Sequence, residues 1–146
     1  MATATLTLKG KPSRASADKG PAATALHRQI DRIRAGLSFH ELEKLQKALG
    51  VTMEKLAQAL GMSRATLHRR KLQRRLAQNE SEKLVRYQRL LEKAADVFGG
   101  ADNARQWLTH PQRGLGDVVP LEFAKSEIGA REVENLLGRI EYGVYS

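Results

Sequence analysis

The residues with the clearest chemistry lie between Ser63 and Gln78, where positive side chains accumulate and no carboxylate occurs. The basic residues in this segment are Arg64, Arg69, Arg70, Lys71, Arg74 and Arg75. Like charges this close together repel one another, so the segment favours a polyanion as its partner. No aromatic residue interrupts it, which argues against a platform that stacks the bases of a single strand. The alternative interpretation is a basic surface that contacts only solvent.

The spacing of residues before and within this segment is typical of a helix-turn-helix. Thr52 and Ser63 are the predicted N-caps of two short helices. Between these helices, Gly61 can adopt the positive φ that a tight turn requires, and Ala57 is small enough for a close crossing. The apolar residues predicted to hold the helices together are Leu56, Leu60, Met62 and Leu67.

A helix-turn-helix places its second helix in the major groove of duplex DNA, with the N-terminal part facing the base edges. The residues expected to face the DNA are Ser63, Arg64, Ala65, His68 and Arg69. The guanidinium groups of Arg64 and Arg69 could bridge O6 and N7 of guanine. The expected phosphate contacts are Arg70, Lys71, Arg74 and Arg75. The stem of Arg70 is expected to pack while its charged head reaches solvent or phosphate.

Charged and aromatic residues divide the chain into two unlike halves. Up to residue 80 there are 16 Lys and Arg against 6 Asp and Glu, whereas residues 81–146 contain 9 and 10. The formal charge of +9 is therefore the sum of +10 and −1. Phe39 is the only aromatic residue before residue 81. The first half is expected to bind a polyanion, and the second to interact through shape and apolar contacts.

The residues before the helix-turn-helix are predicted to form an arm and two helices. Residues 1–20 are interpreted as a flexible basic arm. A helix is predicted from Pro21, with one apolar face made of Leu26, Ile30 and Ile33. Ser38 and Glu41 have the spacing of a capping box for the next helix, whose predicted core residues are Leu42, Leu45 and Leu49.

The second half is also predicted to be helical. Ser81 is the expected cap of a long helix that ends at Gly99–Gly100. Its expected buried stripe is Leu84, Tyr87, Leu91, Ala94 and Phe98, and Trp107 is expected in the same core. The last helix is marked by Val133, Leu136, Leu137 and Ile140. No β-branched run alternates with period two, so the predicted fold is all-α, with a helix-turn-helix domain over residues 21–80 and a small helical domain over residues 81–146.

The second half also resembles a known family. The matching residues, in order, are Ala94-Ala95-Asp96-Val97-Phe98-Gly99, Ala104, Trp107-Leu108, Pro111, Leu115-Gly116, Pro120-Leu121, Gly129, Val133 and Leu137-Gly138-Arg139-Ile140-Glu141-Tyr142-Gly143. This set is similar to the toxin-binding domain of Xre/MbcA/ParS-type antitoxins, from about Leu84 to the C-terminus. The segment from Gly61 to Lys71 resembles the Xre-type helix-turn-helix that these antitoxins carry.

The resemblance implies an antitoxin of a RES–Xre type II toxin–antitoxin module. Such a protein neutralises a toxin encoded beside it, a RES-domain enzyme that consumes NAD, and represses its own operon. In this family the C-terminal domain covers the entrance to the toxin's active site. By position, that role is expected of Arg139, Glu141, Tyr142, Gly143, Val144, Tyr145 and Ser146. Tyr and Arg are enriched at interface hot spots, although Tyr142 and Tyr145 could instead fold back onto their own core.

Composition argues against several other classes of protein. The chain has no Cys, and its four His are scattered without metal-ligand spacing, so no metal or other cofactor is expected. No nucleophile elbow, phosphate loop or dinucleotide fingerprint occurs, so no enzymatic activity is expected. No apolar run approaches the roughly 18 residues of a membrane span, and no signal-peptide core is evident. The expected location is the cytoplasm, with no membrane partner.

Two rival functions remain compatible with the residues. One is a stand-alone dimeric helix-turn-helix repressor, whose second half serves only to dimerise. The other is a non-specific nucleoid-binding protein. Because the domains of 21–80 and 81–146 are small, a homodimer is expected, together with a hetero-oligomer that contains the toxin. A dimer would also fit a palindromic operator with half-sites about one helical turn apart.

Overall fold

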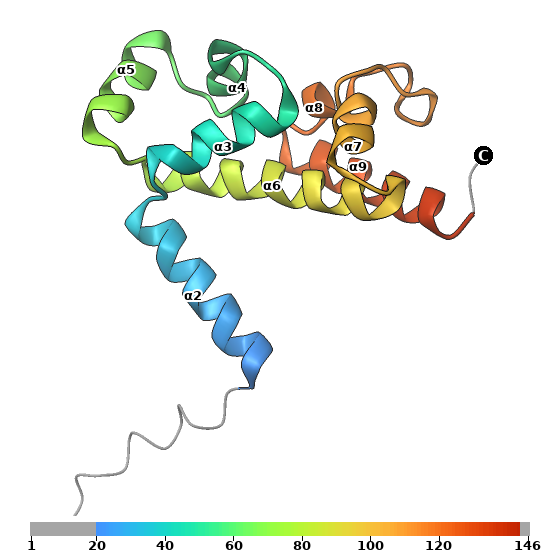
Figure 1. Ribbon diagram of the computed structural model, residues 1–146, viewed down its shortest axis with the longest axis horizontal. Coiled ribbons are helices and arrows are strands. Elements are labelled where there is room, and N and C mark those ends of the chain that lie inside the picture. Colours follow the sequence, from blue (N-terminus) through green and yellow to red (C-terminus); the bar gives the residue numbers. More distant parts are fainter. Residues whose placement is uncertain (1–19, 144–146) are drawn as a thin grey trace, which may run out of the picture. The chain divides into compact units, whose positions relative to one another are not determined.

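The computed structural model describes residues 20–143, and the predicted arm over residues 1–20 lies outside this range except for Gly20. The helices are α2 (Pro21–Ala35), α3 (Phe39–Leu49), α4 (Met53–Ala59), α5 (Arg64–Gln73), α6 (Gln78–Phe98), α7 (Ala101–Leu108), the 3-10 helix η2 (Arg113–Leu115), α8 (Pro120–Phe123) and α9 (Glu127–Glu141). Over the described residues, extended pairing is limited to two isolated β-bridges. The predicted all-α fold is confirmed (Figure 1).

The chain divides into two compact units, residues 1–34 and 35–146. Helix α2 occupies the described part of the first unit. Its predicted apolar face exists, but no residue of α2 is buried, and the side chain of Leu26 is 59% exposed. This helix is therefore amphipathic, and its apolar face includes side chains that are exposed among the described residues.

The predicted helix-turn-helix is formed by α4 and α5, and both of its caps are confirmed. The backbone N–H of Lys55 donates to the Thr52 hydroxyl at 3.1 Å, and that of Thr66 donates to the Ser63 hydroxyl at 3.1 Å. Gly61 turns the chain at φ +78°. Of the residues predicted to hold the pair together, Leu67 is half-buried and the others, Leu56, Leu60 and Met62, are buried.

The prediction of a capping box at α3 is wrong. Ser38 occupies the N-cap position, but its side chain makes no capping hydrogen bond. The backbone beside it pairs instead with the segment that follows α5. Phe39 N–H donates to the carbonyl of Arg74 at 3.1 Å, and Leu76 N–H donates to that of Leu37 at 2.8 Å. These backbone hydrogen bonds join the start of α3 to the end of α5.

The prediction that Ser81 caps the long helix is also wrong. Helix α6 begins at Gln78, because the Glu80 carboxylate accepts a hydrogen bond of 2.8 Å from the backbone N–H of Ala77, the N-cap residue. Ser81 lies in the first turn and is fully buried. Its hydroxyl accepts from Leu37 N–H and donates to the Ala77 carbonyl, both at 2.8 Å. Ser81 therefore joins α6 to the segment that precedes α3.

Helix α6 is the central element of residues 35–146. It packs against α7 and α9, and α3 contacts both α6 and α7 (Figure 1). The buried stripe of α6 contains Leu90, whereas Leu91 and Phe98, which were predicted to be buried, are half-exposed. The buried face is thus centred between Tyr87 and Leu90, because two helices cover α6 from different sides. Trp107, also predicted to be buried, is half-exposed, and its ring centroid lies 5.4 Å from that of Phe98.

The predicted domain boundary between residues 80 and 81 falls inside α6, one turn from its start. Residues 35–146 form a single compact unit, so both predicted domains share this helix. The separate functions assigned to residues 21–80 and 81–146 stay a prediction.

Candidate functional site

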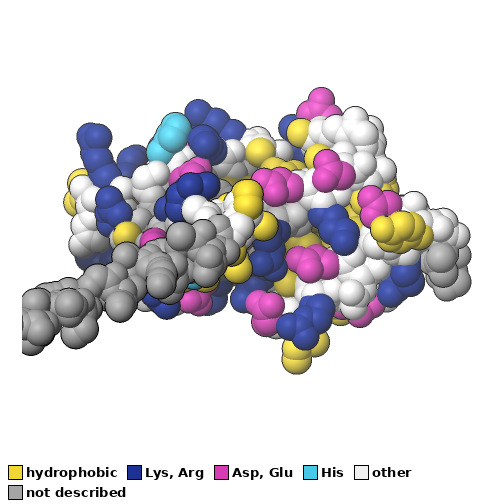
Figure 2. Space-filling view, turned by 90° about the horizontal axis from the view of Figure 1, so that it is seen from below, with side chains coloured by type: hydrophobic (Ala, Val, Ile, Leu, Met, Phe, Trp, Pro, Cys, Tyr) yellow, Lys and Arg dark blue, Asp and Glu magenta, His cyan; other side chains and the backbone are white. Residues whose placement is uncertain are grey.

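Helix α5 presents most of the predicted DNA-facing side chains to solvent. It has no buried residue, and the exposed positions include Arg64, Ala65, His68, Arg69 and Lys71. Among the described residues, the side chains of Arg64, Arg69, Lys71 and Arg74 make no ion pair. These four cations are available to an external anion. On the face shown in Figure 2, Lys and Arg side chains lie at the end that carries α5 in Figure 1, and others alternate with Asp and Glu over the rest of this face.

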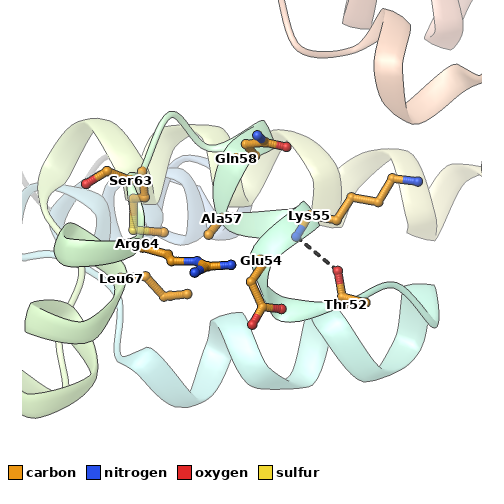
Figure 3. Close-up of a pocket in the computed structure, with 9 residues that line it drawn as sticks. Thr52, Glu54, Lys55, Ala57, Gln58, Ser63, Arg64 and Leu67 are labelled. Carbon is orange, nitrogen blue, oxygen red and sulfur yellow. Dashed lines mark hydrogen bonds between the residues drawn. The ribbon is translucent and has the colours of Figure 1, made fainter.

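A groove of about 390 Å³ separates α4 from α5, and its lining includes residues that are not among the predicted DNA contacts. Besides Ser63 and Arg64, it is lined by Lys55 and Gln58 of α4. Figure 3 shows the side chain of Arg64 extending across the groove toward α4. The position of Lys55 and Gln58 on the first helix of the motif was the sequence signal that could have identified them.

The prediction that the charged head of Arg70 reaches solvent or phosphate is wrong. Its Nε lies 2.7 Å from Oε1 of Glu80, and the side chains are only 18% and 6% exposed. The same carboxylate oxygen accepts the hydrogen bond from Ala77 N–H. A buried carboxylate requires a charged or hydrogen-bonding partner, which explains why Arg70 turns inward. The hydrogen bond to Glu80 raises the pKa of Arg70, so this guanidinium is firmly charged.

Arg75 also has a partner within the fold. Its Nη1 donates to the carbonyl oxygen of Gly36 at 2.9 Å and to that of Ala35 at 3.2 Å. Arg74, by contrast, ends α5 in the left-handed conformation with φ 60°, and lines a separate groove of about 500 Å³ beside Lys71 and His40. The predicted phosphate contacts therefore differ: Lys71 and Arg74 share an open groove, whereas Arg70 and Arg75 stabilise the fold.

The described residues predicted to contact a toxin are gathered around the end of α9. Glu141, Tyr142 and Gly143 are exposed, while Arg139 is half-buried and its Nη2 lies 3.4 Å from a carboxylate oxygen of Glu132. Tyr142 is 80% exposed, so the alternative that it folds back onto the core is wrong. The remaining predicted residues, Val144, Tyr145 and Ser146, lie outside the described residues.

Residues 20–143 also lack two kinds of structural feature. No group of three or more His, Asp or Glu residues is arranged there to hold a metal ion. None of the helices in this range has both the length and the apolar composition to cross a membrane.

The geometry defines a helix-turn-helix protein with an exposed basic second helix and a helical C-terminal module. The sequence matches the family models of an antitoxin Xre-like helix-turn-helix domain over residues 28–89 and of the antitoxin Xre/MbcA/ParS C-terminal toxin-binding domain over residues 93–143. The chain is 34% identical to the protein named Antitoxin Xre of Yersinia enterocolitica over 119 residues, which is 80% of each chain. It is 45% identical to the Antitoxin Xre of Photorhabdus laumondii over 69 residues, or 47% of each chain.

These matches identify the class as DNA-binding antitoxins. The chain belongs to the Xre antitoxin family. A further relative, the Antitoxin Xre of Pseudomonas putida, is 31% identical over 68 residues, which cover 47% of this chain and 43% of the relative. The resemblance predicted from the sequence is confirmed.

Proposed function

We propose that this antitoxin neutralises a RES-type toxin, an enzyme that consumes NAD, by covering the entrance to its active site with the C-terminal module. The observation that carries the proposal is the exposed end of α9 within the matched toxin-binding domain, where Tyr142 is 80% exposed. An aromatic side chain displayed in this way is available to fill a partner's cavity.

Co-expression tests this proposal. The toxin gene expected in the adjacent reading frame is expressed alone, with the full chain, and with a chain lacking residues 144–146. The proposal predicts that the full chain restores growth, co-purifies with the toxin and keeps the cell's NAD level normal. Growth arrest with no change in NAD would contradict the RES assignment, and full rescue by the shortened chain would show that the tail is not needed.

The second part of the proposal is that the chain represses its own operon by binding operator DNA through α5. Arg64 and Arg69 are assigned to base edges, and Lys71 and Arg74 to phosphates, since all four cations lack an ion pair among residues 20–143. Each phosphate contact steepens the dependence of log affinity on log salt by about −0.9. Replacing Lys71 and Arg74 with Ala should therefore flatten the slope by about 2 per protomer.

A salt titration of duplex binding measures this slope, with Arg113→Ala as the control. Arg113 is exposed on η2, so its replacement removes one positive charge without touching the helix-turn-helix. Equal slopes for the double variant and the control would contradict the assignment of Lys71 and Arg74. Equal affinity for the upstream region of the operon and for unrelated duplexes would favour the nucleoid-binding alternative.

A homodimer is the proposed DNA-binding form. The apolar face of α2 supports it, because Leu26 is 59% and Ile30 36% exposed among the described residues and helices of this length seldom remain folded without packing. Sedimentation equilibrium of the full chain tests the proposal, and Leu26→Asp should shift the population toward monomer. A wild-type chain that is monomeric at all accessible concentrations would exclude it.

A further inference from the structure

The solvent face of α9 carries a regular set of residues opposite the buried side. Ile128, Glu132, Asn135, Arg139 and Tyr142 follow one another at intervals of four, three, four and three, which places them on one face of the helix. The buried residues Ala130, Val133, Leu136 and Leu137 lie on the other side and pack into the core. We call the first set the outer face of α9.

Both ends of the outer face are strongly apolar and strongly exposed. Ile128 is 84% exposed and Tyr142 is 80% exposed. Helix rise places these two residues about 21 Å apart. Between them lie an exposed Asn135 and the ion pair of Glu132 with Arg139, at 3.4 Å. Ile128 and Tyr142 are among the most exposed large apolar side chains of the described residues, and each is available to fill an apolar pocket on a partner.

The Ile128 end borders a groove between α8 and α9 of about 520 Å³. Its apolar lining includes Val118, Phe123 and Ile128. The groove is firmly built, because Gly129 N–H donates to the Ser126 hydroxyl at 3.0 Å and Gly129 packs against the backbone of Phe123. A surface with fixed geometry can bind a partner without a large ordering cost.

We propose that the toxin docks along the outer face of α9, with Ile128 and Tyr142 as its two apolar anchors. This inference rests on the proposed neutralisation of a toxin and extends its contact surface from residues 139–146 back along α9 to Ile128, by about three helical turns. The toxin is identified as the occupant for two reasons. The match to the toxin-binding domain, residues 93–143, contains the whole of α9, and Tyr142 is itself one of the predicted toxin contacts. The toxin surface should therefore present two apolar sockets about 21 Å apart with polar groups between them.

The test is the affinity of purified full-length variants for the toxin purified from the adjacent reading frame. Ile128→Asp should weaken binding at least tenfold, which is the loss of one hot-spot residue. The variant should fold, because Ile128 is exposed in the first turn of α9, where a carboxylate is compatible with the helix dipole. Tyr142→Ala should weaken binding by a similar factor.

Leu72→Asp is the matched control, since Leu72 is 72% exposed on α5, outside the toxin-binding module. It should leave toxin affinity unchanged, whereas Ile128→Asp should leave DNA affinity unchanged. If wild type binds the toxin and both α9 variants bind it equally well, the inference fails while the proposed function stands. If Ile128→Asp dissociates a homo-oligomer and leaves toxin affinity intact, the face is a self-interface and the inference is overturned. Failure of the wild type to bind would overturn both proposals.

Discussion

The basic residues of the segment 63–78 in this antitoxin fall into two groups: those that stabilise the fold and those that are available to a partner. Arg70 and Arg75 have partners inside residues 35–146, whereas Arg64, Arg69, Lys71 and Arg74 make no ion pair among the described residues. A count of charges along the segment cannot separate these two groups. The difference depends on what lies opposite each side chain in space.

The pair of Arg70 and Glu80 should make a large contribution to stability. Arg70→Met leaves the Glu80 carboxylate buried without its partner, which should lower the free energy of unfolding by about 3 kcal/mol. The double variant Arg70→Met with Glu80→Gln should recover much of that loss, because no buried charge remains and the amide oxygen can still accept from Ala77 N–H. Urea unfolding followed by circular dichroism measures both changes. Equal losses in the single and double variants would refute this explanation.

Tyr87 should make the protein sensitive to alkaline pH. Burial raises the pKa of Tyr87 to about 12 from an ordinary value of 10.0. The folded state therefore keeps its proton while the unfolded state loses it, and the free energy of unfolding should fall as pH rises from about 10 to 12, by about 1.4 kcal/mol per pH unit. Below pH 9 this contribution is fully present.

Tyr87→Phe is the appropriate comparison for the alkaline effect. The Tyr87 hydroxyl is 3.4 Å from the Leu121 carbonyl, a long hydrogen bond, so the substitution should cost little at neutral pH. Above pH 10 the variant should lose stability more slowly than wild type. Parallel stability curves for the two proteins would assign the alkaline loss to other groups.

Local sequence signals predicted the residues whose partners are near in sequence, and failed where the partner is distant. Thr52 and Ser63 bond to backbone three residues away, so their types and positions were sufficient. Arg70 departs from its predicted exposure because its partner, Glu80, belongs to the next helix. The available sequence signal for this ion pair was Glu80, the first carboxylate after the six positive residues.

At the level of elements, α9 depends on a close approach that only glycine allows. A Cβ added at Gly129 would lie 1.7 Å from the carbonyl oxygen of Phe123, whereas one at Gly138 would meet only the Nζ of Lys93, at 4.0 Å. Gly129→Ala should therefore destabilise the protein by about 1–3 kcal/mol, since α8 and α9 must separate.

Gly138→Ala supplies the matched control within the same helix. Because the added methyl has room, it should stabilise the protein by about 0.5–1 kcal/mol through the higher helix propensity of alanine. Thermal unfolding of both variants measures the opposite signs. Two shifts of the same sign would show that helix propensity, rather than contact with α8, decides the outcome.

Periodicity predicted the existence of the helices better than their ends and faces. The buried face of α6 differs from the predicted stripe because α7 and α9 cover it together and bury Leu90 instead of Leu91. The helix starts before the predicted cap because Ser81, a good cap by residue type, accepts a tertiary hydrogen bond from Leu37 N–H. Neither fact is contained in the local pattern.

At the level of the whole molecule, residues 35–146 should unfold as one cooperative unit. Trp107, the single tryptophan, reports on the C-terminal module, while Leu56 is buried in the helix-turn-helix. Leu56→Ala should lower the free energy of unfolding by about 2–5 kcal/mol. The fluorescence midpoint of Trp107 should fall together with the midpoint from circular dichroism, because α6 belongs to both modules. An unchanged Trp107 transition would indicate two independent domains.

The sharing of α6 limits how toxin–antitoxin pairs of this kind can diversify. Recombination that joined residues 1–80 to the C-terminal module of another antitoxin would divide the first turn of α6 between Glu80 and Ser81. Glu80 pairs with Arg70, and the hydroxyl of Ser81 accepts a hydrogen bond from Leu37 N–H. Each exchanged module would have to bring a compatible first turn. On the proposed docking of the toxin along the outer face of α9, new toxin specificity should therefore arise by point substitution on that face. Lineages that recognise different toxins should still share an interchangeable α6.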